Sequence, residues 1–494
     1  MSAAAPVCKP PRPATCFEHP FDTCWEAITR AVLARASVLR SASQKRLPVE
    51  QGSVALRVIR LLVTIAAAGA MLPAAAYGAS WTTEGTLGPT GLAESALTSV
   101  SCVSAGPCMA VGVDDDGYDS SQSSLQNVGS FAESWNGSAW AVVPTAGSAG
   151  ASPGLYAISC VSAVFCVAVG QTHSNGRSSL ALDGGYGAQR ALVEAWNGVG
   201  WTVQSNPGAA LSGSGLFSVS CTSSRFCVAV GDHGNYGLAE VWNGLTWGLR
   251  TTPPVKFGAG LAGVSCVTVK WCTAVGFYNT SKVGQEVYMP LAERWNGRRW
   301  NVQRPPPEWL RYHGRVYANF TYLTGVSCTS RSFCLASGDA ERAQNGDGAG
   351  SFAVRWNGAR WIAATAGRPH NSPFYALSCL SSTDCLAIGQ FENSVFPAPD
   401  TTQPLAEGWN GKRWDRLALP HVAPPSGATR DSPDARDPAL FGVSCVAQSG
   451  CTAVGAQGQG SDSAALAQSD MGTPGAAAPP PVKPTLACPP AGVG

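Results

Sequence analysis

Fourteen of the eighteen cysteines form seven pairs, and five residues separate the two members of each pair. Two thiols at this spacing can bind a metal ion or form a disulfide bond. Zinc sites combine two such pairs at a matching distance, and the chain lacks that arrangement, so the spacing favours disulfides. The pairs are Cys102 with Cys108, Cys160 with Cys166, Cys221 with Cys227, Cys266 with Cys272, Cys328 with Cys334, Cys379 with Cys385, and Cys445 with Cys451.

An acidic run at residues 113–121, VDDDGYDSS, gathers carboxylates that could bind Ca²⁺, a cation that prefers oxygen ligands. The candidate ligands are Asp114, Asp116 and Asp119. The run departs from the EF-hand register because a glycine follows its first three aspartates. A solvated acidic loop is the alternative interpretation, and we expect no other cofactor.

The segment 305–323, PPPEWLRYHGRVYANFTYL, concentrates aromatic rings beside charged side chains. Aromatic faces next to polar groups suit the recognition of a sugar or of a protein. The candidate ligand-binding residues are Trp309, Tyr312, His313, Tyr317 and Tyr322. The alternative is a structural loop that uses its aromatic side chains to cover one end of the fold.

A glycan-cleaving or glycan-oxidising enzyme would need carboxylates on one face, about 5–10 Å apart for hydrolysis. Asp114, Glu308, Asp339 and Asp437 are the candidates for that alternative. The histidines lack the spacing of a metal site, and no nucleophile-elbow, P-loop or dinucleotide motif stands in a strand-to-helix context. We therefore assign no catalytic residue, and the sequence favours a protein that is not an enzyme.

A repeat through residues 97–470 must position all of these side chains. Each unit begins with a segment such as LFSVSC, passes through five variable residues to CVAVG, and ends with a segment such as LAEVWNGLTW. Short apolar runs bounded by turn residues are typical of β-strands. Each unit therefore predicts four antiparallel strands.

The Asn-Gly pair of each unit predicts a two-residue type I′ hairpin turn, which needs positive φ at both positions. In the fourth unit this turn, at 296–297, would place Trp295 opposite Arg298 and Glu293 opposite Trp300. The two tryptophans fall on one face of the sheet by the period of two and should pack together.

The glutamate of the LAE segment occurs in five units, which suggests a structural hydrogen bond rather than catalysis. It stands at positions 133, 194, 240, 293 and 407.

Repeated four-stranded units predict an all-β fold, a β-propeller. Seven units carry a cysteine pair, but the seventh, which starts at Leu440, lacks the final Trp-containing strand. A lone copy of that strand stands around Trp81. We therefore predict a seven-bladed β-propeller over residues 79–470, closed by an N-terminal outer strand around Trp81.

The cysteine pairs then flank the turn between the first two strands of each blade, where Cα atoms can approach to about 5.5 Å. Seven disulfides should result, each worth about 2 kcal/mol through the restricted unfolded chain. Cys488 lies in the Ala/Pro-rich tail, residues 471–494, which should be disordered, and it stays without a partner inside the chain.

The combined motif VSCx5CxAVG…LAExWNGxxW resembles the repeat of kelch and galactose-oxidase-like β-propellers, and most closely that of a group of secreted bacterial proteins. The resemblance covers about four-fifths of the chain. Because those secreted proteins are largely uncharacterised, the resemblance implies the propeller fold and little chemistry. The chain departs from true kelch units, since their paired glycines are not a regular feature of it, and the sialidase Asp-box is absent. The Tyr and His residues of the galactose oxidase copper site cannot be mapped one by one onto this chain, so no catalytic residue is carried over.

Arg57 and Arg60 precede the apolar run 61–72, and small residues follow it, which is typical of a secretory signal peptide. We place the signal peptide at 54–78, with cleavage after Ala76 or Gly78, and an uncleaved anchor is the alternative. Residues 1–53 are either an extension or the result of a mis-assigned start. The protein should therefore be secreted or attached to the cell envelope.

The charge balance argues against nucleic acid as a partner, because the net charge is +2 over 494 residues. The loops that follow AVG vary from six residues after Gly231 to 21 residues after Gly170. Variable loops on a rigid scaffold commonly carry recognition. We predict a monomeric binding module for a carbohydrate or a protein, which binds through the face that holds these loops.

Overall fold

The computed structural model describes residues 81–470 apart from short gaps, all within the unit Pro73–Gly494. The gaps are residues 87, 89–93, 105, 116–117, 120–123, 126–128, 148–151, 174–188, 256, 281–286, 308–309, 313–314, 318, 343–349, 365–371, 394–400, 423–437, 448–449 and 458–463. The predicted extension, signal peptide and tail lie outside the described residues. In the described part of the chain, no helix is long and apolar enough to cross a membrane.

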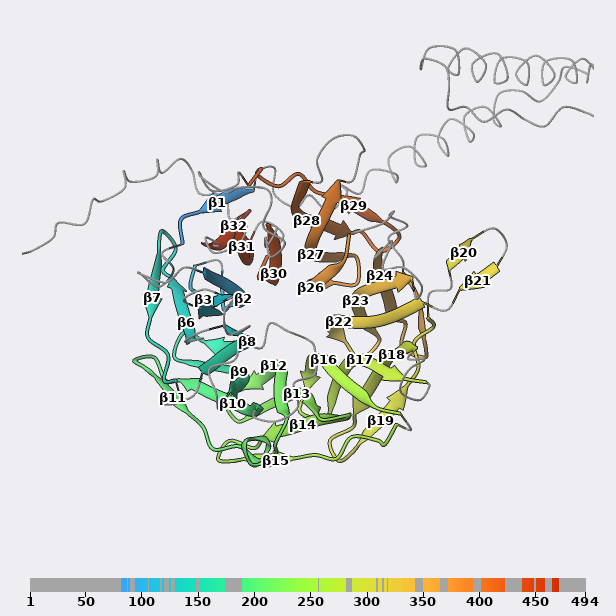
Figure 1. Cartoon of the computed structure of the whole chain (residues 1–494), viewed down its shortest axis with the longest axis horizontal. Coiled ribbons are helices and arrows are strands. Elements are labelled where there is room, and N and C mark those ends of the chain that lie inside the picture. The colour runs from blue at the N-terminus through green and yellow to red at the C-terminus, as the bar shows by residue number, and fades with distance from the viewer. Residues whose placement is uncertain are drawn as a thin grey trace, which may run out of the picture. The chain divides into compact units, whose positions relative to one another are not determined.

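Seven four-stranded antiparallel sheets form a ring of blades, and the first strand of each repeat unit lies nearest the centre (Figure 1). Blades 1 to 4 consist of β2 (Glu94–Cys102), β3 (Cys108–Asp115), β6 (Gly129–Trp135) and β7 (Trp140–Val143); β8 (Ser152–Ser162), β9 (Phe165–His173), β10 (Gln189–Trp196) and β11 (Trp201–Val203); β12 (Ser214–Ser223), β13 (Phe226–His233), β14 (Tyr236–Trp242) and β15 (Trp247–Leu249); and β16 (Ala259–Thr268), β17 (Trp271–Asn279), β18 (Tyr288–Trp295) and β19 (Trp300–Gln303). Blades 5 to 7 consist of β22 (Asn319–Ser330), β23 (Phe333–Arg342), β24 (Gly350–Trp356) and β25 (Trp361–Ala363); β26 (Phe374–Ser381), β27 (Asp384–Asn393), β28 (Thr401–Trp409) and β29 (Trp414–Arg416); and β30 (Ala439–Cys445), β31 (Cys451–Gln457), β32 (Ala464–Ser469) and β1 (Thr82–Glu84). The predicted seven-bladed β-propeller is confirmed.

Three small elements lie between the blade strands. Two are short hairpins, β4–β5 (Tyr118–Asp119 with Ser124–Leu125) and β20–β21 (Leu310–Tyr312 with Arg315–Tyr317). The third is a 3-10 helix at Pro207–Ala210.

The ring closes through the strand that follows Trp81, as the sequence predicts. β1 pairs antiparallel with β32, with Thr82 opposite Ser469 and Glu84 opposite Ala467. The hydroxyl of Ser469 also donates a hydrogen bond to Oε1 of Glu84 at 2.8 Å. Blade 7 is therefore built from both ends of the repeat region, which fixes the two ends of the ring to each other.

The core is divided among the seven interfaces between blades. Each of seven hydrophobic clusters joins two adjacent blades, and one of them joins blade 7 to blade 1 through residues such as Leu97 and Val454. Apolar side chains on both faces of each sheet are thus buried against a neighbour, which explains the near-continuous apolar runs of the second strands.

The Trp-Asn-Gly turns differ from the prediction. Trp295 lies opposite Trp300 and Glu293 lies opposite Val302, so the loop spans four residues rather than two. Oδ1 of Asn296 accepts the N–H groups of Arg298 and Arg299, both at 3.0 Å, and this side-chain bonding stabilises the wider turn. The predicted tryptophan pairing is confirmed, because the two rings pack with centroids 5.6 Å apart.

All seven predicted disulfides are present, and their Cα atoms lie 3.9–4.0 Å apart, closer than the predicted distance of about 5.5 Å. The reason is that the two cysteines are directly opposed in the ladder, as in blade 4. Seven disulfides are consistent with an extracellular protein. The bonds join Cys102 to Cys108, Cys160 to Cys166, Cys221 to Cys227, Cys266 to Cys272, Cys328 to Cys334, Cys379 to Cys385, and Cys445 to Cys451.

A second feature of the repeat explains the glycine of AVG. Each first strand contains a β-bulge that starts at the residue opposite this glycine, as between Leu261 and Gly263 in blade 4. A Cβ at Gly276 would overlap the carbonyl oxygen of Gly260. The corresponding glycine of every other blade meets a carbonyl in the same way, so the bulged strand needs glycine there.

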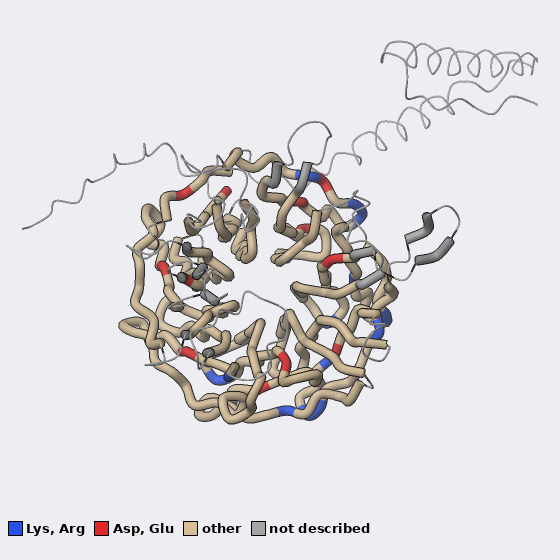
Figure 2. Tube along the Cα trace, viewed as in Figure 1, with Lys and Arg blue, Asp and Glu red and all other residues tan. Residues whose placement is uncertain are grey.

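Strand order places the turns of the blades on two faces. The disulfide face, as we name it, holds the cysteine turns and the Trp-Asn-Gly turns, and the loop face holds the loops after AVG and the connections between blades. Charge is distributed unevenly around the ring (Figure 2). Blades 1 and 7 carry no Lys or Arg among their described residues, and most of the basic residues belong to blades 3 to 6.

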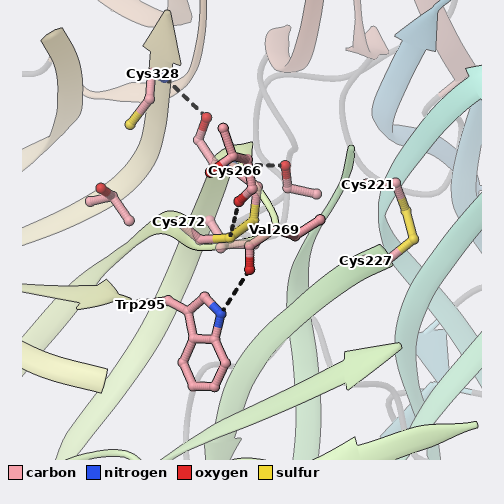
Figure 3. The surroundings of a disulfide bond; sticks show 12 residues. Cys221, Cys227, Cys266, Val269, Cys272, Trp295 and Cys328 are labelled. Atoms are coloured by element: carbon pink, nitrogen blue, oxygen red, sulfur yellow. Dashed lines mark hydrogen bonds between the residues drawn. A yellow bond between two sulfur atoms is a disulfide. The ribbon is translucent and has the colours of Figure 1, made fainter. Parts of the chain in front are cut away.

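Serine hydroxyls link the first strands into a closed ring of hydrogen bonds. The serine that precedes the first cysteine of each blade accepts the N–H of the first cysteine of the next blade, at 2.9–3.1 Å. The seventh bond, from Cys102 N–H to Ser444 Oγ at 3.0 Å, joins blade 1 to blade 7. Figure 3 shows this environment around the Cys266–Cys272 disulfide, where Nε1 of Trp295 also donates to the carbonyl of Val269.

In blades 1 to 3 the glutamate of the LAE segment holds the connection that enters its own blade. Glu133 accepts the N–H of Gly88, and Glu240 accepts the N–H of Gly208 at 2.5 Å. Glu194 accepts two N–H groups, from Ala146 and Gly147. These bonds agree with the structural role expected from the sequence.

Candidate functional site

The structure describes only part of the predicted aromatic site. Trp309 and His313 lie outside the described residues. Tyr312 and Tyr317 belong to the β20–β21 hairpin, where the backbone is described and the side chains are not. Tyr322 lies in β22, the innermost strand of blade 5, rather than in a connecting loop.

The structure also describes only some of the predicted calcium ligands. Asp114 lies in β3 and is 8% exposed. Asp119 lies in β4, where only the backbone is described, and Asp116 is outside the described residues. No group of three or more metal-binding side chains occurs among the residues that the structure covers. The calcium interpretation stays a prediction.

Tyr322 is where blade 5 departs from the repeat. At this position, directly before the large apolar residue of the first strand, the other blades carry a small residue or proline: Ala96, Gly154, Gly215, Gly260, Pro373 and Ala439. A tyrosine here adds a large polar ring at the loop-face end of the strand. A residue that the repeat does not require points to a local role.

Tyr322 is directly opposite Asp339 of β23, and its hydroxyl donates to Oδ2 of that carboxylate at 3.2 Å. Asp339 is only 5% exposed, and its Oδ1 accepts the N–H of Ala340 at 2.7 Å. The pair therefore offers a fixed, buried carboxylate beneath a half-buried phenol ring.

Blades 6 and 7 extend this group. Tyr375 is the residue left out of the ladder by the bulge in β26, and its hydroxyl donates to Oε1 of Gln390 in β27 at 3.2 Å. Its ring packs on Phe441 of blade 7, with centroids 5.6 Å apart. We call the set Tyr322, Asp339, Tyr375, Gln390 and Phe441 the aromatic–carboxylate cluster.

Electrostatics tie the two halves of the cluster together. Burial, and secondly the nearby charge of Asp339, raise the pKa of Tyr375 to about 12. The phenol thus stays protonated at neutral pH and acts as a hydrogen-bond donor, not as a base. Together the side chains present ring faces, a carboxylate and an amide, which is a set suited to binding a polar ligand.

Another carboxylate occupies the equivalent of Asp339 in blade 3. Burial raises the pKa of Asp232 to about 7. Asp232 faces blade 4, because a Cβ at Gly260 would lie 3.6 Å from its Oδ2. It belongs to a different blade interface from the aromatic–carboxylate cluster.

The carboxylates proposed for an enzyme are not brought together in the described structure. Asp339 lies in blade 5 and Asp114 in blade 1, and these blades are not neighbours in the ring. Glu308 and Asp437 lie outside the described residues.

Sequence reasoning found Tyr322 and Asp339 for separate reasons and missed Tyr375, Gln390 and Phe441. Aligning the seven units would have marked Tyr322 as an exception, because the other six positions hold Ala, Gly or Pro. Tyr375 and Phe441 occupy the bulged position, which varies among Thr, Tyr, Phe and Ala, so no pattern distinguished them.

This chain matches no protein-family model and no curated protein. Solved structures similar to it include YCF48 bound to D1 peptide, with 10% identity, a TM-score of 0.43, and coverage of 80% of this chain and 98% of that chain. An ulvan lyase of a polysaccharide lyase family matches with 10% identity, a TM-score of 0.37, and coverage of 67% and 86%. The same enzyme bound to its saccharide matches with 9% identity, a TM-score of 0.38, and coverage of 70% and 87%. At these identities no residue or ligand is transferred to this chain.

Proposed function

We propose that the protein is a secreted or envelope-associated binding module that captures a carbohydrate through its loop face. The observation that carries this proposal is the aromatic–carboxylate cluster, in which half-buried rings lie beside a buried carboxylate. Sugar rings stack on aromatic faces, and their hydroxyls bond to carboxylates and amides. A protein ligand is the alternative for the same face.

Binding accounts for the cluster better than catalysis does. The pKa of Tyr375 is raised to about 12, so its phenol is not a base near neutral pH. Asp339 already accepts two hydrogen bonds, from Tyr322 and from the N–H of Ala340. The Tyr375 phenol thus stays a hydrogen-bond donor, and the Asp339 carboxyl group is held in place by its two bonds.

Incubation of the purified, oxidised protein with neutral and uronic polysaccharides and with envelope fractions tests the proposal. Retention and released sugar are measured on the same samples. The Tyr375→Phe and Asp339→Asn variants should bind about 3- to 30-fold more weakly, because each removes one hydrogen bond or one charge. Tyr156→Phe is the matched control, since Tyr156 occupies the same bulged position in blade 2.

Retention that weakens in both cluster variants and not in the control supports the proposal. Released or oxidised sugar would instead identify a glycan-active enzyme. If every polysaccharide passes through unretained while an envelope protein is captured, the ligand is a protein and the carbohydrate proposal is wrong.

A further inference from the structure

The disulfide face carries a strongly one-sided charge. Ten cationic side chains of blades 3 to 6 lie on its turns or at the strand ends beside them, and we call them the basic arc: Arg225, Lys270, Arg294, Arg298, Arg299, Arg331, Arg355, Arg360, Lys412 and Arg413. Among the described carboxylates at this end of the blades, Asp384 and Asp470 are buried. Asp415 is half-buried and pairs with Arg413 at 2.9 Å.

This local excess contrasts with the rest of the chain. Residues 79–494 contain 24 Lys and Arg against 27 Asp and Glu, a net charge of −3 (24 − 27). Ten of the 24 cations therefore belong to one face of four consecutive blades. Within the described structure, only Arg413 of the ten forms an ion pair. Uncompensated charge of one sign raises the local concentration of oppositely charged partners.

The packing of the turns brings the cations of each blade together. A Cβ at Gly297 would lie 2.9 Å from the Lys270 side chain, so the cysteine turn of blade 4 lies against its Trp-Asn-Gly turn. Lys270 thus stands beside Arg298 and Arg299, and all three are exposed. In blade 5 the same contact forms between Ser332 and Gly358. It places the turn that carries Arg331 against the turn that carries Arg360.

One guanidinium is held in place before any ligand arrives. Arg294 lies over the ring of Trp271, 4.6 Å from its centroid, and 5.9 Å from the centroid of Trp356 in the next blade. Trp271 is one of the few tryptophans that the repeat does not require. Cation–π contacts on two sides lower the entropy lost when Arg294 binds an anion.

A groove of about 550 Å³ continues the basic arc between blades 5 and 6. Arg355 is the cation in its wall, and Asn357 with the hydroxyls of Ser330, Ser332 and Ser381 supplies further polar groups. Arg355 is half-buried, whereas the turn arginines are exposed. Guanidinium and hydroxyl donors together suit sulfate or phosphate oxygens.

We propose that the disulfide face is a second binding surface, which takes an anionic polysaccharide or a similar linear polymer that carries sulfate or phosphate groups. The cations follow consecutive blades as a track, which matches the repeated charges of a chain. Arg294 and Arg355 are half-buried, whereas the arginines on the turns are exposed. A flexible linear polymer can reach such half-buried groups more easily than the flat surface of a membrane can. This site is separate from the aromatic–carboxylate cluster, because the two lie at opposite ends of the blades.

A lipid surface is the competing partner, and it is an outcome of the test. Aliphatic tips on the same face in blades 2 and 3, Val199 and Leu245, are 89% and 85% exposed. Val199 belongs to blade 2, outside the basic arc, whereas Leu245 directly follows Gly244, where a Cβ would lie 3.3 Å from Arg225, the first cation of the arc.

Equilibrium binding of the full chain to dextran sulfate, long-chain polyphosphate, uncharged dextran and phosphatidylglycerol vesicles tests the proposal. The wild type should bind the first two and not dextran, and affinity should fall at least about tenfold between about 50 and about 200 mM salt. Arg298→Glu combined with Arg299→Glu should weaken binding by about tenfold or more. Arg190→Glu combined with Arg250→Glu is the matched control, because Arg190 lies at the loop-face end of β10 and Arg250 directly follows the loop-face end of β15.

All variants keep the lysines and arginines of residues 1–80. Differences in affinity among the variants therefore come from the substituted residues of the propeller. Arg355→Gln provides a second test with a smaller charge change, and thermal melting verifies that each variant is folded. Equal weakening by the two double variants would overturn the proposal, because net charge alone would then explain binding. Binding to vesicles without binding to either polymer would also overturn it. Loss of neutral-sugar retention in Tyr375→Phe with unchanged polyanion binding would show that the two sites are independent.

Discussion

Glu293→Gln should remove the pH dependence that one buried carboxyl imposes on stability. Glu293 is 1% exposed, and burial raises its pKa to about 8. Its Oε2 has no hydrogen-bond partner among the described residues. The folded protein therefore binds this proton up to about pH 8, while the unfolded chain releases it near its ordinary pKa of 4.5.

Because the folded state binds more protons in that window, the free energy of unfolding decreases as pH rises from about 4.5 to about 8. Between about pH 5 and about pH 9 the loss from this single group is about 4 kcal/mol, since each pKa unit corresponds to about 1.4 kcal/mol. Glutamine is close in shape and does not titrate. The variant should thus be similar to the wild type at low pH and more stable than it at high pH.

Urea unfolding followed by tryptophan fluorescence, with the disulfides intact, measures this difference at both pH values. Asp232 and Glu240, whose pKa values burial raises to about 7, titrate in both proteins and cancel in the comparison. Glu194→Gln is the matched control, because Glu194 occupies the same repeat position and accepts two backbone N–H bonds that oppose the effect of burial on its pKa. A Glu293→Gln difference that is the same at low and high pH would refute the argument, because the carboxyl would then be ionised throughout.

Two further predictions concern the repeat itself. Gly276→Ala should destabilise the protein by several kcal/mol, measured as a lower melting temperature, because the new methyl group would overlap the Gly260 carbonyl oxygen; Gly200→Ala, with nothing within 4 Å, should change little, and equal effects would contradict this explanation. Ser220→Ala should cost about 1 kcal/mol and speed hydrogen exchange at the Cys266 amide, which donates to the serine hydroxyl at 3.0 Å. Unchanged protection of that amide would show that the serine ring does not stabilise the junction.

The local features of the fold were predictable because their residues are close in sequence. The cysteines of each pair are six positions apart, and a hairpin brings them together whatever the rest of the chain does. The Trp295–Trp300 pair follows from the same hairpin logic. The register of this hairpin was not predictable in the same way. Asn296 accepts two backbone N–H groups, and this widens the turn beyond the two residues that Asn-Gly favours.

Ring closure could also be read from the chain, since the seventh unit lacks one strand and Trp81 carries a spare copy of it. The side chains that form the aromatic–carboxylate cluster could not be read from the chain. Tyr375 and Phe441 belong to different units, and Asp339 acts on Tyr375 across a blade interface. Such neighbours depend on how blades pack, which periodicity does not encode.

The number of blades, the seven disulfides and the closing strand follow from the order of the residues, because each is set by short-range pairing repeated at regular intervals. The side chains that meet at the loop face, and the ten cations at the opposite end of the blades, come together only when the blades pack into a ring. Strand direction sends each turn to one face of that ring. Residues from different blades, about fifty positions apart in sequence, then become neighbours through packing alone.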